Sequence, residues 1–403
     1  MPNLIVGSVP RGEDYFDRED LIENLWTRLQ TDSVLLVAPR RFGKTGAMYR
    51  LLDEPREPYR PLYVDVEPIL SPADFVVELL ALLLRDHHFS RISAALWKGT
   101  KGLGRFLRDL PAGVNIGELK IEIRERTDVP THWRSYGDRI MSLLAKESPA
   151  LLLLLDEFAV MVWNIAQRDR REVEQFLRWF RAARTSPETR TRFVIGGSIN
   201  LVSTLDALGL VDTINDLSII RMKPFSPGTA GRFVEAVFTT REVELPPEVK
   251  ETILKLVGEP IPYFLAVFLT AVLERQRATH DPLDSDLVEA AFEEDLMEGS
   301  VSVVLQHYRS RIGQYYPDAE GRAARAILGL LSRSDAPVSR DALYQLFLKA
   351  GNTPAGQESE EAFSRLMNRL DNDFYVVAKD GKYGFFSRLF QLWWRSRYGF
   401  QVE

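Results

Sequence analysis

Apolar residues change their spacing along this chain, and the changes predict strands that alternate with helices. Five short apolar runs are typical of strands buried on both faces of a sheet, and they occupy 34–37, 61–67, 150–158, 192–198 and 218–223. Between these runs apolar residues recur at helical spacing, most clearly in 71–86, 132–148 and 171–186. The alternation predicts an α/β domain with a parallel sheet over residues 1–224.

The pattern changes at Ser226, after which only helical spacing recurs. The expected helices occupy 226–240, 246–258, 262–279 and 285–296. We interpret residues 225–300 as a helical lid that follows the α/β domain.

The pattern in residues 301–403 predicts a further domain, in which helices are followed by a β-hairpin with Asp380-Gly381 at its turn. The helices are expected at 303–316, 321–333, 339–351 and 360–373, and the hairpin at 375–386. This order favours a winged helix-turn-helix. In the last of these helices we expect an outward face made by Ser364, Arg365, Asn368 and Arg369.

The stretch from about 97 to 130 interrupts the α/β pattern. Leu119, Ile121 and Ile123 alternate with polar residues, which indicates a hairpin insertion. Just before it, His87 and His88 close the helix at 71–86. Adjacent side chains on a helix point in different directions, so we do not expect these two histidines to share a metal ion.

A phosphate-binding loop is predicted directly after the first apolar run. The Walker A pattern G-x-x-x-x-G-K-[ST] supplies backbone N–H donors, a lysine for phosphate and a hydroxyl for Mg²⁺. Its eight positions here are Ala38, Pro39, Arg40, Arg41, Phe42, Gly43, Lys44 and Thr45. Alanine replaces the first glycine, which is acceptable only if that position has an ordinary φ. Gly46 and the helix that follows would aim a positive dipole at the anion.

A second motif supplies the carboxylates that a nucleotide site needs. Five leucines at 151–155 lead into Asp156 and Glu157, the form of a Walker B strand. At the end of this strand Asp156 would hold Mg²⁺ together with Thr45, and Glu157 would polarise the attacking water. The alternative is a core strand with a solvated end, but the presence of both motifs in this order favours the nucleotide site.

Composition and charge narrow the function classes. The chain of 403 residues has no cysteine, which excludes a disulfide, a thiol nucleophile and a cysteine-based metal site. We find no secretory leader and no apolar run of membrane-spanning length, so we expect a cytoplasmic protein without a membrane partner. Residues 321–403 carry 12 Lys and Arg against 9 Asp and Glu, in a chain of net charge -6. A basic C-terminal part permits contact with nucleic acid without requiring it.

These motifs resemble the archaeal-type ATPase family, in the STAND branch of the AAA+ superfamily that is also described as the MNS NTPases. The resemblance covers about residues 14 to 300. Its carriers are F-D-R-E at 16–19, P-R-R-F-G-K-T at 39–45, L-L-D-E-F at 154–158, G-G-S at 196–198 and G-E-P-I-P-Y at 258–263.

The resemblance implies an AAA+-like sheet of order 5-1-4-3-2 and further site residues. Adenine would lie near Phe16 and Arg18, and a lid proline, either Pro260 or Pro262, would touch the nucleotide. A polar residue at the end of the fourth strand would sense the γ-phosphate. Ser198 holds that place, with Asn200 as second choice; the alternative for Ser198 is a turn residue after a pair of glycines.

The leading hypothesis is a slow, Mg²⁺-dependent ATPase in which ATP or ADP sets the position of the helical lid and the winged helix. Lys44, Glu157 and Ser198 would be its catalytic residues. A second hypothesis is an ATP-licensed DNA-binding regulator or mobile-element accessory factor that contacts duplex DNA through the winged helix. A third is a protein-interaction scaffold. The pattern leaves the partner and the oligomeric state open.

Overall fold

The computed structural model describes residues 3–89, 92, 115–197, 200–297, 299–351 and 354–399. The chain forms two compact units. One, the sheet unit, comprises residues 18–40 and 44–222. The other, the helical unit, comprises residues 1–17, 41–43 and 223–403. The middle of the predicted phosphate-binding loop therefore belongs with the N-terminal segment and the C-terminal half of the chain.

The sheet unit is built on a parallel five-stranded sheet of order β2-β3-β4-β1-β5, which confirms the predicted order. Its strands are β1 (Val34–Val37), β2 (Tyr59–Asp65), β3 (Ala150–Asp156), β4 (Arg192–Gly196) and β5 (Ser218–Arg221). Every residue of β1 and β3 is buried, as expected for uninterrupted apolar runs with helices on both faces. The register pairs Asp65 of β2 with Asp156 of β3, so both carboxylates lie at the same edge of the sheet.

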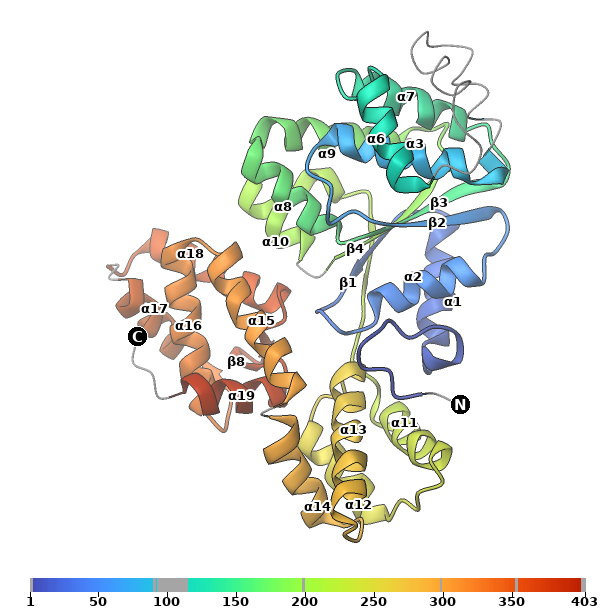
Figure 1. The fold of residues 1–403 in the computed structure, drawn as a ribbon. Helices are drawn as coiled ribbons and strands as arrows, with labels where there is room; N and C mark the ends of the chain where they lie inside the picture. Colours follow the sequence, from blue (N-terminus) through green and yellow to red (C-terminus); the bar gives the residue numbers. More distant parts are fainter. Residues whose placement is uncertain are drawn as a thin grey trace. The chain divides into compact units, whose positions relative to one another are not determined.

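Helices cover the sheet, and they pack in groups that Figure 1 shows: α3 with α6, α7 and α9, and α1 with α2. The helices of this unit are α1 (Glu19–Leu29), α2 (Lys44–Asp53), α3 (Pro72–Arg85), α6 (Ile116–Arg126), α7 (Trp133–Leu144), α8 (Phe158–Arg168), α9 (Arg170–Thr185) and α10 (Leu201–Leu208). Aromatic side chains fill the space between α3 and α9, where Phe75 lies edge-on to Phe176 and Phe180.

The hairpin predicted around Leu119 to Ile123 is wrong, because these residues belong to helix α6. The spacing was ambiguous, since apolar residues at every second position also place the first and third of them one helical turn apart. Leu119 and Ile123 are buried, whereas Ile121 is 52% exposed. Asn115 caps the helix by accepting a hydrogen bond from the N–H of Glu118 at 3.0 Å. The remainder of the predicted insertion, residues 97–114, lies outside the described residues.

The first part of the helical unit after β5 contains helices only, as predicted. They are α11 (Pro227–Thr240), α12 (Pro247–Val257), α13 (Pro262–Thr279) and α14 (Ser285–Ala290), which continues into a π-helical turn at Ala291–Leu296. Prolines open the first three, and the side chain of Asp284 caps the fourth. Helix α13 presents eight buried apolar side chains to its neighbours, so it forms the core of this group.

The C-terminal part combines helices with a small antiparallel sheet of order β6-β8-β7. Its elements are α15 (Ser300–Tyr315), α16 (Asp318–Arg333), β6 (Val338–Ser339), α17 (Arg340–Gly351), α18 (Gln357–Asn372), β7 (Val376–Lys379), β8 (Lys382–Phe385) and α19 (Arg388–Tyr398). Asp380 and Gly381 have φ of 51° and 71°, the left-handed conformation that a two-residue hairpin turn requires. The order of α16 to β8 is the one that the sequence predicted, with β6 as an additional strand.

One residue of the predicted outward face of α18 points elsewhere. The side chain of Arg369 is only 13% exposed, and its guanidinium lies 4.0 Å from the ring centroid of Tyr316. It also pairs with Glu320 at 3.3 Å. Arg365 and Asn368 are exposed as expected. Arg369 is thus a packing residue of this part of the chain, because its position borders the buried face of the helix.

No helix among the described residues is both long enough and apolar enough to cross a membrane.

The packing of α7 on α9 generates a stability prediction. A methyl group on Gly137 would lie 2.5 Å from a ring atom of Trp179, whose indole N–H is fixed by Asp138 at 2.8 Å. We expect Gly137→Ala to lower the free energy of unfolding, since overpacking costs about 1–3 kcal/mol. The higher helix propensity of alanine relative to glycine stabilises the fold by only about 1 kcal/mol. Chemical denaturation of the full chain measures the difference.

Gly313→Ala is the matched control. Gly313 is also helical, but no atom lies within 4 Å of the place where its side chain would begin. This substitution should leave stability unchanged or raise it by up to about 1 kcal/mol. Equal effects of the two substitutions would contradict the packing argument.

Candidate nucleotide site

The predicted phosphate-binding loop connects β1 to α2, and it has the backbone that the motif requires. Gly43 has a φ of 90°, which a residue with a side chain rarely adopts. Ala38 is not among the described residues with positive φ, so alanine fits the first position. The Lys44 ammonium is buried and donates hydrogen bonds to the carbonyl oxygens of Ala38 and Pro39, at 2.7 and 2.8 Å. These bonds hold the two ends of the loop together.

The two predicted magnesium ligands meet in the sheet unit. The Thr45 hydroxyl donates a hydrogen bond of 2.6 Å to Oδ2 of Asp156, although 111 positions separate the two residues in sequence. Gly46 follows in the buried first turn of α2. Tyr63 from β2 also donates to Oδ2 of Asp156, at 3.3 Å. Sequence reasoning missed Tyr63; the available signal was its place on the strand expected to neighbour the acidic one.

The end of β4 lies against the same residues. A side chain at Gly196 would begin 2.7 Å from the terminal carbon of Met48, 3.7 Å from the Asp156 carboxylate and 3.9 Å from the Lys44 side chain. Glycine at this position therefore avoids a close contact with Met48 and borders the lysine and the carboxylate. Ser198, two residues further on, lies outside the described residues. Asn200, the second choice as sensor, caps α10 by accepting a hydrogen bond from the Val202 N–H at 2.8 Å.

Glu157 sits at the junction between β3 and α8 with a φ of 57°. A left-handed backbone at a residue other than glycine costs free energy, and such residues cluster at functional sites. The backbone N–H of Glu157 donates to Oδ1 of Asp156 at 3.0 Å, so the Asp156 carboxylate is held by the backbone of the next residue.

Negative charge dominates this edge of the sheet. Burial raises the pKa of Glu67, and the nearby charges of Glu157 and Asp65 raise it further, while Arg40 partly opposes them. Burial and the charge of Asp156 likewise raise the pKa of Tyr63. An oxygen-rich site with excess negative charge matches what Mg²⁺ prefers. The hydroxyl of Thr45 and the carboxylate of Asp156 therefore fit the ion by their chemistry.

The middle of the loop, residues 41–43, makes its contacts within the helical unit. Phe42 is 1% exposed, and its ring centroid lies 6.5 Å from that of Phe374 and 5.9 Å from that of Phe386. The Arg41 guanidinium lies 4.6 Å from the ring centroid of Tyr263. We call Phe42, Phe374 and Phe386 the loop aromatic cluster.

Tyr15 is a second residue that sequence reasoning missed. Its ring lies 3.0 Å from the point where a side chain on Gly43 would begin, so it packs directly on the loop glycine. The signal was its position immediately before the F-D-R-E segment.

The remaining predicted residues fall in both units. Phe16 packs on Phe233 and Phe225, with ring centroids 5.3 and 6.4 Å away. Arg18 precedes the first residue of α1 in the sheet unit. In the helical unit, the carbonyl of Pro260 accepts a hydrogen bond from the Phe225 N–H at 3.0 Å, and Pro262 is the first residue of α13. Both prolines remain candidates for the nucleotide contact.

Comparisons with solved structures show proteins of similar fold. No family model matches the chain, and neither does any curated protein. A Walker-type ATPase of Pyrococcus abyssi is similar in structure, with a TM-score of 0.62 and 17% sequence identity over 97% of this chain and 99% of that chain.

A second similar structure is the ORC2 protein of Aeropyrum pernix, solved in ADPNP and ADP complexes. It has a TM-score of 0.53 and 14% identity, and the match covers 95% of this chain and 92% of that chain. Likeness at these identities concerns the fold. The chain thus has the α/β P-loop fold that these two nucleotide-associated proteins share.

Proposed function

We propose that this protein binds ATP with Mg²⁺, hydrolyses it slowly and acts as a nucleotide-dependent switch. The observation that carries the proposal is the 2.6 Å contact between Thr45 and Asp156 beside the loop lysine. Magnesium, when bound, neutralises charge on the phosphates and orients them for attack by water. The similarity to a Walker-type ATPase supports the same reading.

Each residue of the candidate site would have its own role in nucleotide binding and hydrolysis. Lys44 would turn from the loop carbonyls toward phosphate oxygens, and the backbone around Gly43 would approach the anion closely. Thr45 and Asp156 would hold the metal, the latter oriented by Tyr63. Glu157 would take a proton from the attacking water, the role of a general base. Ser198 remains the proposed sensor of the γ-phosphate.

The switch rests on the loop aromatic cluster. Phe42 belongs to the phosphate-binding loop by sequence, and it is buried against Phe374 and Phe386 beside the C-terminal hairpin. A change in the loop that accompanies ATP or ADP binding would therefore alter the contacts of Phe42 with the C-terminal part, which we interpret as a winged helix. Coupling of this kind typically amounts to 1–3 kcal/mol, or about 5- to 150-fold in affinity.

A second function, ATP-licensed DNA binding, is favoured by the exposed cations of the C-terminal part. Arg365 of α18 and the hairpin residues Lys379 and Lys382 are exposed. Arg369 is no longer a candidate, because Tyr316 and Glu320 hold it. Without DNA contact, the same surface would serve a protein partner, as in the scaffold hypothesis.

Two substitutions separate binding from turnover. We expect Lys44→Ala to abolish ATP binding measured by calorimetry, because the phosphates lose their cation. Glu157→Gln should retain binding and reduce turnover about 100-fold or more, the usual contribution of a general base. Normal hydrolysis by Glu157→Gln would show that another group activates the water.

Removing one ring of the loop aromatic cluster tests the switch. We expect Phe386→Ala to accelerate nucleotide exchange by about tenfold, since the C-terminal part would hold the loop less firmly. Stopped-flow release of a fluorescent ADP analogue measures the rate. Phe347→Ala is the matched control, because Phe347 packs in the same part of the chain on Tyr344 and Phe363. Equal exchange rates in both variants would refute the coupling.

Duplex DNA distinguishes the second function. If DNA is the partner, fluorescence anisotropy will show salt-dependent binding that requires ATP. Replacing Arg365, Lys379 and Lys382 by alanine should then reduce the salt slope by about one for each lost phosphate contact. Lys255→Ala, an exposed cation of α12, should have no effect. Failure to bind DNA at low salt would leave the protein partner.

A further inference from the structure

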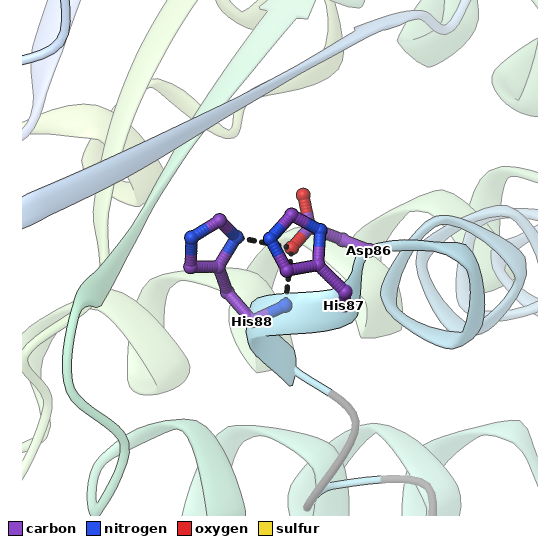
Figure 2. A group of neighbouring side chains, drawn as sticks. All are labelled: Asp86, His87 and His88. Carbon is purple, nitrogen blue, oxygen red and sulfur yellow. Dashed lines mark hydrogen bonds and ion pairs between the residues drawn. The ribbon is translucent and has the colours of Figure 1, made fainter.

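Asp86, His87 and His88 form a cluster at the end of helix α3, away from the nucleotide chemistry described above. The helix ends at Arg85, and Asp86 has an extended backbone with a ψ of 120°. His87–Phe89 then form a short 3-10 turn, which the buried Phe89 anchors. Because the histidines lie on this turn and not on the helix, the argument that their side chains diverge does not apply. Their ring centroids are 3.9 Å apart (Figure 2).

We propose that Asp86, His87 and His88 bind a divalent transition-metal ion of the zinc class. One ligand atom from each side chain lies within 4.8 Å of the other two. Oδ1 of Asp86 and Nδ1 of His88 are 3.2 Å apart and form a hydrogen bond. Two ligands bound tetrahedrally at zinc distances are about 3.3 Å apart, so this pair already has the required separation. His87 is exposed, and a small turn of its ring brings in the third ligand.

The carboxylate is oriented by groups that leave one oxygen directed at the rings, as Figure 2 shows. Arg60 of β2 donates two hydrogen bonds to Oδ2 of Asp86, at 3.2 and 3.0 Å. Oδ1 accepts the His88 backbone N–H at 2.9 Å and faces the imidazoles. The Asp86 side chain is only 8% exposed, so its orientation is fixed by packing as well. Outer partners of this kind orient ligands in known metal sites.

The ligand types select the metal. Two neutral imidazoles and one carboxylate suit Zn²⁺, Co²⁺ or Ni²⁺, whereas Mg²⁺ and Ca²⁺ need more oxygen ligands. The positive charge of Arg60 offsets the negative charge of Asp86, so a hard cation held mainly by charge gains little here. Nδ1 of His88 becomes a ligand when the metal displaces the proton that it shares with Oδ1 of Asp86. Three protein ligands leave at least one position for water. A bound ion would tie the end of α3 to β2 through Asp86 and Arg60.

The test uses the full chain with any affinity tag removed, because polyhistidine would itself bind zinc. Calorimetric titration with Zn²⁺ should show one ion per chain at this site. Co²⁺ should give visible absorption bands typical of nitrogen and oxygen ligation. We expect His88→Ala to weaken binding at least tenfold, and His87→Ala to do the same. Weaker binding at acid pH should follow, since imidazole binds metal only when neutral.

Two further variants keep the test decisive. Asp86→Asn preserves shape but removes the anionic ligand, so it should also weaken binding and shift the Co²⁺ spectrum. His132→Ala is the matched control, because His132 is exposed and faces Asp128 at 3.6 Å without a second histidine. Melting curves without metal confirm that each variant is folded. Absence of Zn²⁺ binding, or unchanged binding in the three ligand variants, would overturn the proposal.

Discussion

The contact on which the candidate site depends is the hydrogen bond between the Thr45 hydroxyl and the Asp156 carboxylate. Thr45 lies in the helix after β1, and Asp156 is the last residue of β3. The two strands are not neighbours, because β4 lies between them. The two residues meet near Gly196, the last residue of β4, where a side chain would begin 2.7 Å from the terminal carbon of Met48. The end of the middle strand therefore borders the residues that the two motifs bring together.

Much of this arrangement could be predicted from the sequence because the relevant signals are local. The leucine run of β3 has the length and the uniform apolar character of a strand buried on both faces, and Asp380-Gly381 permits a tight hairpin turn. The order of the strands came from a resemblance to a family, since the apolar runs themselves do not determine which strands pair. The proximity of Thr45 to Asp156 followed from that order.

What the sequence did not predict depends on neighbours distant in the chain. Ile121 is spaced as a strand residue, but pairs between α6 and α3, such as Lys120 with Glu78 at 2.6 Å, favour the helix. Its position in the sequence predicted Arg369 to be a surface cation, but in the structure it packs against Tyr316 and Glu320. Tyr63 gained its role only when the register placed β2 beside β3. In each case periodicity indicated a face of the element, and tertiary packing decided what covers that face.

In the middle of the loop, the backbone conformation of Arg41 is linked to the burial of the neighbouring Phe42 side chain. Arg41 has a φ of 71°, and a left-handed backbone at such a residue costs about 1–2 kcal/mol. Full burial of a phenylalanine stabilises by about 1.5–3 kcal/mol. The two quantities are similar, so the observed loop depends on Phe374 and Phe386 remaining over Phe42. In the proposed switch, a nucleotide that changes the conformation of the loop also changes the contact between Phe42 and the C-terminal part. Because coupling is reciprocal, a partner that binds the C-terminal part would change the affinity for the nucleotide by the same factor.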